Sequence, residues 1–413
     1  MIKVLKKISN TIQANITLPA SKSISNRLLV LQKLYNLSIQ IHNLSDSDDT
    51  KVLYNCLHTE SKNWDVENCG TAMRFLISYA AITSGNYILS GNERMHERTV
   101  KPLVDALRAL GTEINYIEKE GYPPLIIVGK DIIDYPETIQ IDGSVSSQYV
   151  SSLMMVGCKL DKGLNIQLTG IISSKPYIQM TLKLMQNLGL DILWDEEKNI
   201  IYSKKYSEQN SSVQNYNIES DWSAASYSYL WVLAIPNLQI DIENISINSV
   251  QGDSICIEYF KKFGVSTKEN SHNHISMVKD KNIIQNELLF DCCDCLDIAP
   301  TLALAAFITQ TKVTLTGLQN LKHKESDRLK VLCTELNKFS PNSATIISDD
   351  VLYIHRTAQI NFDETLETYG DHRIAMGFSV LASYGDLKIN NPDVVSKSFP
   401  GFWDEMGKAG CEL

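Results

Sequence analysis

The chain repeats one pattern at a spacing near 75 residues, and this repetition limits its fold more than any single motif. Apolar residues at helical spacing, as at 100–110, mark a helix that a glycine or serine ends. Five such stops, 78, 75, 76 and 70 residues apart, lie at Gly111, Gly189, Gly264, Ser340 and Gly410. A shorter opening copy, whose helix follows Asp48, makes six.

A second series of helices alternates with the first. Each begins with small or polar residues and continues into an apolar run long enough for a helix that is buried on most sides. The six starts lie near Ser23, Gly70, Ser146, Ser223, Asp297 and Asp371. Short strand-like runs, as at 138–141, 164–168 and 312–315, separate the helices. Because the period exceeds that of ordinary solenoids, the pattern predicts two compact α/β domains of three units each.

Charged and hydroxyl side chains gather at the predicted helix starts and not along the helix faces. The segment Ser-Lys-Ser-Ile-Ser-Asn-Arg at 21–27 is one case, and 97–98, 174–176, 324–328 and 396–398 are others. Any one of them is ordinary capping. A cation at a helix start is unfavourable by roughly 0.3–1 kcal/mol, so its repetition indicates that anions bind there.

The composition narrows the class of protein. The net charge of −10 and the pI near 5.4 argue against a nucleic-acid binder or a protein of anionic membranes. The N-terminal residues lack the apolar core of a signal peptide, and apolar runs such as 229–235 fall short of the ~20 residues that span a bilayer. Nine cysteines, an odd count, favour reduced thiols and a cytoplasmic enzyme.

A cysteine cluster raises the question of a metal. Cys292, Cys293 and Cys295 stand close together, but no matching Cys or His pair follows at ligand spacing. His272 and His274 lie upstream in a polar stretch that reads as a surface loop. Buried or strand cysteines explain the cluster better, so we expect no metal.

The motifs together resemble the EPSP synthases, the enolpyruvyl transferases of the shikimate pathway. The segment 18–27 is similar to the N-terminal signature of that family, and Asn-Cys-Gly-Thr-Ala-Met-Arg at 68–74 to its Asn-x-Gly-Thr-x-x-Arg element. Further matching motifs, in the family's order, lie at 94–98, 143–148, 174–177, Asp297, 324–328, 371–376 and Lys397. So many matches in one order exceed chance.

The resemblance implies a fold and an activity. The fold would be two similar domains, each an inverse α/β barrel-like prism of three βαβαββ repeats, joined by a double-crossover hinge. We expect one domain at 20–218 and the other at 1–19 plus 219–413. The reaction would transfer the enolpyruvyl group of phosphoenolpyruvate to the 5-hydroxyl of shikimate 3-phosphate, on the route to chorismate and aromatic amino acids. We expect no cofactor and a monomer.

The resemblance also implies roles for matching residues. The residues expected to bind shikimate 3-phosphate are Lys22, Ser23, Arg27, Ser146, Ser147, Gln148, Ser174, Asp297, Asn320 and Lys324. Those expected to bind phosphoenolpyruvate are Lys22, Gly70, Arg98, Gln148, Arg328, Arg373 and Lys397. Their cations suit two ligands that carry phosphates and carboxylates.

The reaction needs a base for the hydroxyl and an acid for the methylene carbon. We expect Asp297 to take the hydroxyl proton, with Glu325 and Lys22 as the remaining exchange partners. Simpler interpretations stand beside these: Asp297 as a helix N-cap, Glu325 in a solvated first helical turn, and His372 as a capping or orienting residue.

Two other functions stay open. A UDP-N-acetylglucosamine enolpyruvyl transferase would share the fold and the donor, but the motifs at 21–27 and 324–328 suit a compact phosphorylated acceptor. A non-catalytic anion-binding or RNA-end-processing protein could use a similar repeat. The acidic net charge and the retained carboxylates Asp297 and Glu325 argue against it.

Overall fold

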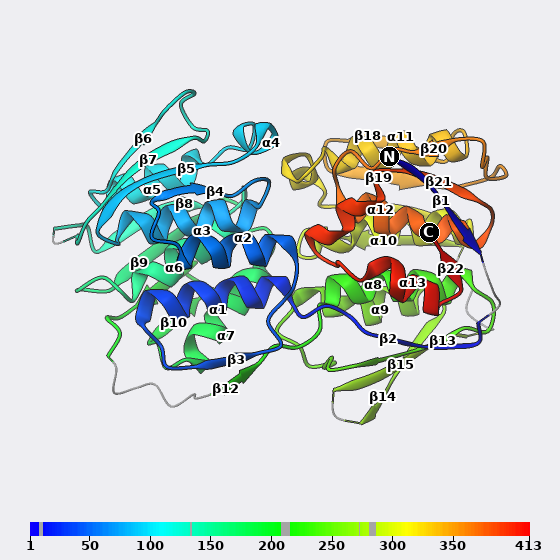
Figure 1. The fold of residues 1–413 in the computed structure, drawn as a ribbon, viewed down its shortest axis with the longest axis horizontal. Helices are drawn as coiled ribbons and strands as arrows, with labels where there is room; N and C mark the ends of the chain where they lie inside the picture. The colour runs from blue at the N-terminus through cyan, green and yellow to red at the C-terminus, as the bar shows by residue number, and fades with distance from the viewer. Residues whose placement is uncertain (8–10, 133, 208–214, 272, 281–285) are drawn as a thin grey trace. The chain divides into compact units, whose positions relative to one another are not determined.

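The computed structural model describes residues 1–7, 11–132, 134–207, 215–271, 273–280 and 286–413. The chain forms two compact units (Figure 1). Unit 1 comprises Met1–Ser21 and Glu219–Leu413, and unit 2 comprises Lys22–Ile218. The chain therefore passes between the units twice, and both units are built from helices and small mixed sheets.

Unit 2 has a layer of inner helices and a layer of outer ones. The inner helices α1 (Lys22–Tyr35), α3 (Gly70–Ala81) and α6 (Ser147–Gly157) contact one another. Outside them lie α2 (Asp48–His58), α5 (Lys101–Ala109) and α7 (Lys175–Asn187), with the short α4 (Glu93–His96) before α5. This arrangement directs the apolar surface of every long helix toward one core.

Two four-stranded sheets and one strand pair complete the described part of unit 2. The first sheet has the order β4-β5-β7-β6, formed by β4 (Asn63–Asp65), β5 (Gly85–Ser90), β6 (Glu113–Tyr116) and β7 (Leu125–Gly129). The second has the order β8-β9-β11-β10, formed by β8 (Thr138–Asp142), β9 (Leu164–Thr169), β10 (Ile192–Asp195) and β11 (Ile200–Ser203). The pair joins β3 (Gln40–His42) to β12 (Asn215–Asn217) in parallel.

Unit 1 repeats this helical plan. Its inner helices α8 (Trp222–Ala234), α10 (Ala299–Thr309) and α12 (His372–Phe378) contact one another. The other helices are α9 (Cys256–Lys261), α11 (Arg328–Phe339) and α13 (Phe402–Lys408). Short 3₁₀ helices precede or follow them: η2 (Gly252–Ile255), η3 (Leu296–Ile298), η4 (Gln319–His323), η5 (Ser379–Ser383) and η6 (Pro392–Lys397).

Three four-stranded sheets belong to the described part of unit 1. The first has the order β2-β13-β15-β14, from β2 (Gln13–Ile16), β13 (Gln239–Glu243), β14 (Val265–Ser271) and β15 (His274–Lys279). The second has the order β16-β17-β19-β18, from β16 (Glu287–Asp291), β17 (Lys312–Thr316), β18 (Ala344–Ser348) and β19 (Val351–Ile354). The third has the order β20-β21-β1-β22, from β20 (Thr365–Leu366), β21 (Leu387–Asn390), β1 (Ile2–Lys7) and β22 (Cys411–Glu412).

All five four-stranded sheets share one topology. In each, the first two strands are parallel, as where Asn63 of β4 lies opposite Ile88 of β5, and the remaining contacts are antiparallel. A parallel pair needs a crossover connection. An inner helix supplies it in four of these sheets, whereas the chain between β2 and β13 passes through unit 2 and then α8. The start of the chain adds β1 and β2 to two sheets of unit 1. The repeat that begins at α1 has only the pair β3–β12, which fits the shorter opening copy expected from the sequence.

Most residues of the inner helices are buried, as the second sequence series predicts. In α10 every residue from Ala299 to Ile308 is buried, and in α8 every residue from Trp222 to Leu233. Of the expected helix stops, Gly111, Gly189, Gly264 and Gly410 all have positive φ, between 82° and 104°. That left-handed conformation ends a helix at little cost only for glycine.

Three local expectations are wrong, as is the alternative interpretation of Asp297 as a helix N-cap. Arg98 does not start a helix: it follows the C-cap of α4 and precedes α5. Lys397 is the last residue of η6, five residues before α13 begins. Asp297 lies inside η3, and Ile298 is the N-cap of α10. His274 begins strand β15 opposite Glu243, while His272 lies outside the described residues.

The polar runs at 97–98 and 396–398 mislead because the residue types that begin helices are also common in turns and loops. Among the described residues, no helix combines the length and the apolar character needed to cross a bilayer.

Candidate functional site

In unit 2, the first residue of α1 supplies a partly buried cation. The Nζ atom of Lys22 lies 2.8 Å from Oδ2 of Asp49, and the two side chains are only 15% and 6% exposed. Asp49 is held in place because it belongs to the first turn of α2, which Ser47 caps. The pair fixes the lysine ammonium at the start of α1, where the helix dipole also favours an anion.

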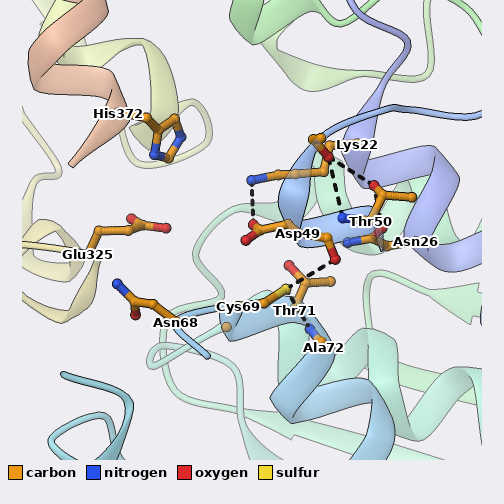
Figure 2. Close-up of polar contacts among 12 residues, drawn as sticks. Lys22, Asn26, Asp49, Thr50, Asn68, Cys69, Thr71, Ala72, Glu325 and His372 are labelled. Carbon is orange, nitrogen blue, oxygen red and sulfur yellow. Dashed lines mark hydrogen bonds and ion pairs between the residues drawn. The ribbon is translucent and has the colours of Figure 1, made fainter. Parts of the chain in front are cut away.

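Cys69 links this ion pair to the next inner helix. Its Sγ atom accepts a hydrogen bond from the backbone N–H of Ala72 at 3.3 Å and donates to the carbonyl of Asp49 at 3.6 Å. Figure 2 shows Lys22 extended toward Asp49 and the Cys69 sulfur lying between Asp49 and Ala72. The thiol therefore acts as the N-cap of α3.

Gly70, the first residue of α3, lies directly against two arginines. A Cβ atom on Gly70 would stand 2.6 Å from Nη2 of Arg98 and 2.7 Å from Nη1 of Arg74. Arg74 donates to the Gly70 carbonyl at 3.1 Å, and Arg98 donates to Oδ1 of Asn68 at 3.4 Å. The absence of a side chain at residue 70 lets both guanidinium groups approach this helix start.

The start of α6 meets the start of α3. Ser146 is the N-cap of α6, and its hydroxyl accepts a hydrogen bond from the N–H of Gln148 at 3.2 Å. The Gln148 amide donates to Oγ1 of Thr71 at 3.1 Å. Ser147 is buried, and Ser174 precedes α7 with a left-handed φ of 55°. Hydroxyl and amide groups thus surround the cations of this unit.

Arg27 is buried among neutral groups. Its guanidinium donates to Oγ1 of Thr181 at 2.7 Å and to Oγ of Ser151 at 3.2 Å, and it stacks over Phe75. Burial lowers the pKa of Arg27 to about 10, because the opposing effect of Tyr177 is smaller. Its neighbour Ser23, on the same helix, is partly exposed.

In unit 1, Asp297 binds three cations at once. Its Oδ1 atom lies 3.1 Å from Nη1 of Arg328 and 3.3 Å from Nζ of Lys324. Its Oδ2 atom lies 2.9 Å from Nη2 of Arg373. Burial alone would raise the pKa of Asp297, but the three cations outweigh it and hold the pKa well below its usual range.

Arg328 is the centre of this network. It is 1% exposed, and besides Asp297 it donates to Oε2 of Glu325 at 2.6 Å and to Oδ2 of Asp371 at 2.8 Å. Burial lowers the pKa of Arg328, whereas the surrounding carboxylates raise it above its usual value. Asp371 is fully buried, caps α12 and accepts from Ser326 at 2.9 Å. The three carboxylates therefore compensate the charge of the buried Arg328 guanidinium within the protein.

The remaining expected residues lie on short elements of unit 1. Asn320 belongs to η4, just before Lys324, and is partly exposed. Lys397 ends η6 and is partly exposed as well. His372 is the first residue of α12, where Asp371 and not His372 is the N-cap.

The sequence reasoning assigned no role to several residues that shape these sites. They are Asp49, Arg74, Ser151, Thr181 and Asp371. The runs Asp-Asp-Thr at 48–50 and Asp-His-Arg at 371–373 already hinted at the two aspartates. Ser151 and Thr181 gave no signal, because they lie inside helices where hydroxyls commonly bond to the backbone.

Among the residues that the structure describes, no three His, Cys, Asp or Glu side chains are grouped so that they could hold a metal ion.

The two-unit architecture is that of the enolpyruvyl transferases. An EPSP synthase from Acinetobacter baumannii matches with a TM-score of 0.76 at 19% identity, covering 100% of this chain and 99% of that one. An enolpyruvyl transferase from Streptomyces tendae matches with a TM-score of 0.70 at 11% identity, covering 100% and 98%. At these identities the likeness establishes the fold.

The family follows from sequence. The family model described as EPSP synthase (3-phosphoshikimate 1-carboxyvinyltransferase) matches residues 54–406. A 3-phosphoshikimate 1-carboxyvinyltransferase from Bacteroides fragilis is 39% identical over 99% of this chain and 98% of its own length. One from Vibrio campbellii is 32% identical over 97% and 98%. The chain belongs to the EPSP synthase family.

Proposed function

We propose that this chain transfers the enolpyruvyl group of phosphoenolpyruvate to the 5-hydroxyl of shikimate 3-phosphate, in the pathway to chorismate and the aromatic amino acids. The observation that carries the proposal is the family match, which spans residues 54–406. Cations in the first turn of helices in both units support it, namely Lys22 in unit 2 and Arg328 and Arg373 in unit 1, because both substrates are polyanions.

The chemistry is an addition followed by an elimination. The 5-hydroxyl oxygen forms a bond to C2 of phosphoenolpyruvate while the methylene carbon takes up a proton, which gives a tetrahedral intermediate. The C–O bond to phosphate then breaks, the methyl group loses a proton, and the enol ether and inorganic phosphate leave. The methylene carbon gains one proton in the addition, and the resulting methyl group loses one proton in the elimination.

Unit 2 supplies neutral donors and cations for these substrates. In the proposal, Lys22, Ser23, Arg27, Ser174 and the segment Ser146–Ser147–Gln148 hold shikimate 3-phosphate. Gly70, Arg98 and Lys22 hold phosphoenolpyruvate, with Gln148 contacting both ligands. Each phosphate carries about −1.5 to −2 charges, so charge-assisted hydrogen bonds of roughly 1.5–3 kcal/mol each are available.

Unit 1 supplies the carboxylates. Asp297 is proposed to take the proton of the 5-hydroxyl, while Glu325 and Lys22 exchange protons with the methylene carbon and the departing phosphate. Asn320 and Lys324 hold the acceptor; Arg328, Arg373 and Lys397 hold the donor. The low pKa of Asp297 keeps it ionised and able to accept a hydrogen bond from the hydroxyl.

We also propose that the enzyme works in the cytoplasm as a monomer. The nine cysteines are all free, which suits a reducing compartment. Light scattering of the purified protein over a range of concentrations tests the monomer, since a mass near twice 46.4 kDa contradicts it.

Release of phosphate tests the activity. We expect turnover only with phosphoenolpyruvate and shikimate 3-phosphate together. Turnover with UDP-N-acetylglucosamine as acceptor would identify the related transferase instead, and no turnover with either acceptor would support a non-catalytic anion-binding protein. Lys22→Ala should abolish the reaction, while Lys51→Ala, an exposed lysine of the same unit, should not.

A further inference from the structure

A buried carboxylate of unit 1 has no role in the proposed reaction. Asp253 lies in η2, is 3% exposed and follows Gln251 and Gly252. Gln251 ties this loop to the start of α8, because its Oε1 atom accepts from the N–H of Trp222 at 3.1 Å and its amide donates to the carbonyl of Ser220 at 2.8 Å. The loop is therefore fixed, and Asp253 with it.

The two oxygens of Asp253 have unequal surroundings. Ser223, in the first turn of α8, donates a short hydrogen bond to Oδ2. Within the described part of the chain, Oδ1 is buried without a hydrogen-bond partner. An ionised carboxylate normally accepts several hydrogen bonds, so an orphaned buried oxygen favours the neutral acid.

The charged surroundings act in the same direction. The titratable groups that interact electrostatically with Asp253 are Asp221, Cys256, Cys295, Asp297 and Arg373. Burial and the nearby Asp297 raise the pKa of Asp253 to about 7, against the opposing effects of Ser223 and Arg373. Arg373 therefore interacts with two carboxylates, of which Asp297 is the one in direct contact at 2.9 Å.

We propose that Asp253 is a positioning residue that controls Arg373: as a neutral acid it leaves Arg373 to Asp297 and the substrate, and as an anion it competes with the substrate for that guanidinium. This inference rests on the proposed function, in which Arg373 binds phosphoenolpyruvate. Because the added charge opposes anion binding, the KM for phosphoenolpyruvate should rise as the pH passes 7. The value of kcat should change less, since Asp253 contacts no reacting atom.

The test compares the pH dependence of KM in four proteins. In the wild type we expect KM for phosphoenolpyruvate to increase about tenfold between pH 6 and pH 8.5. A tenfold change corresponds to an interaction between the Asp253 charge and the bound anion that shifts the pKa of Asp253 by about one unit. Asp253→Asn keeps the size and the neutral charge, so most of that increase should disappear. Asp393→Asn removes an exposed carboxylate of the same unit and should keep the wild-type profile. The phosphate groups of the substrates titrate equally in all four.

Ser223→Ala is the fourth protein and guards against misfolding of Asp253→Asn. Without the Ser223 hydroxyl the anion of Asp253 loses its hydrogen bond, so the rise in KM should move to higher pH. If Asp253→Asn and Ser223→Ala both retain turnover and both show the wild-type pH profile, the role of Asp253 is overturned and the proposed function is not affected. No turnover in the wild type overturns the proposed function and this inference together.

Discussion

The two units carry similar helical frames, but two buried arginines of unit 2 and two of unit 1 have opposite surroundings. In unit 2, Arg27 and Arg74 donate to hydroxyls and backbone carbonyls, and within the described residues neither forms an ion pair. In unit 1, Arg328 and Arg373 are paired with Asp297, and Arg328 also with Asp371. The difference shows that the same architecture can surround a buried arginine with neutral hydrogen-bond acceptors or with carboxylates that compensate its charge.

This contrast has a chemical consequence. An anion that binds Arg27 adds a counter-charge to a site that lacks one, whereas an anion that binds Arg328 has to share it with three carboxylates. Unit 2 is thus suited to tight binding of charge. In the proposed reaction Asp297 and Glu325 of unit 1 exchange protons, a role that suits a unit in which carboxylates already surround the arginine.

The largest expected effect is on turnover. Asp297→Ala should lower kcat by about 10²- to 10⁴-fold, the usual contribution of a general acid or base. The phosphate-release assay measures the loss. Asp349→Ala, which removes an exposed carboxylate of the same unit, is the control and should leave the rate unchanged. A rate for Asp297→Ala within tenfold of the wild type would remove Asp297 from its proposed role.

The second effect is on stability and compares the units directly. Arg328→Met leaves Asp371 and Glu325 buried without their cation and should cost about 3–5 kcal/mol in urea unfolding. Arg27→Met should cost less, about 1–3 kcal/mol, because it breaks hydrogen bonds to neutral groups and strands no charge. Equal losses for the two variants would show that the contrast between the units has no energetic meaning.

A smaller effect is expected at the start of α3. Gly70→Ala places a methyl group 2.6 Å from Nη2 of Arg98, so the guanidinium has to move away from its position. We expect KM for phosphoenolpyruvate to rise about tenfold, with little change in melting temperature, because only flexible side-chain ends are displaced. Gly401→Ala is the matched control, since nothing lies within 4 Å of its added Cβ.

The smallest effect concerns acid stability. The pKa of Asp297 is lower in the folded state than in the unfolded one, so its stabilising contribution is complete above about pH 4 and is lost as the pH falls toward the folded value. Arg373→Met removes one of the three cations and raises the folded-state pKa of Asp297, so this loss should be smaller and should end at a higher pH. Urea midpoints between pH 2 and pH 6 measure it, and identical profiles for variant and wild type would contradict the assigned coupling.

Local patterns in the sequence were enough to predict much of the fold. The six apolar runs became buried inner helices, and four glycine stops became left-handed residues after helices, because burial and backbone sterics act over a few neighbouring positions. The segment at 18–27 and its companion motifs were enough to predict the family, which the comparison over residues 54–406 confirms. The roles of the individual site residues stay predictions.

Only the tertiary structure decided how the charges are satisfied. No local pattern indicates that Lys22 pairs with Asp49, that Arg27 contacts Thr181, or that Arg328 lies among three carboxylates. The same holds for Asp253, whose neighbour Asp297 is far along the chain. The physical reason is that electrostatic and desolvation energies depend on distance in space, and residues dozens to hundreds of positions apart become neighbours only when the repeats pack.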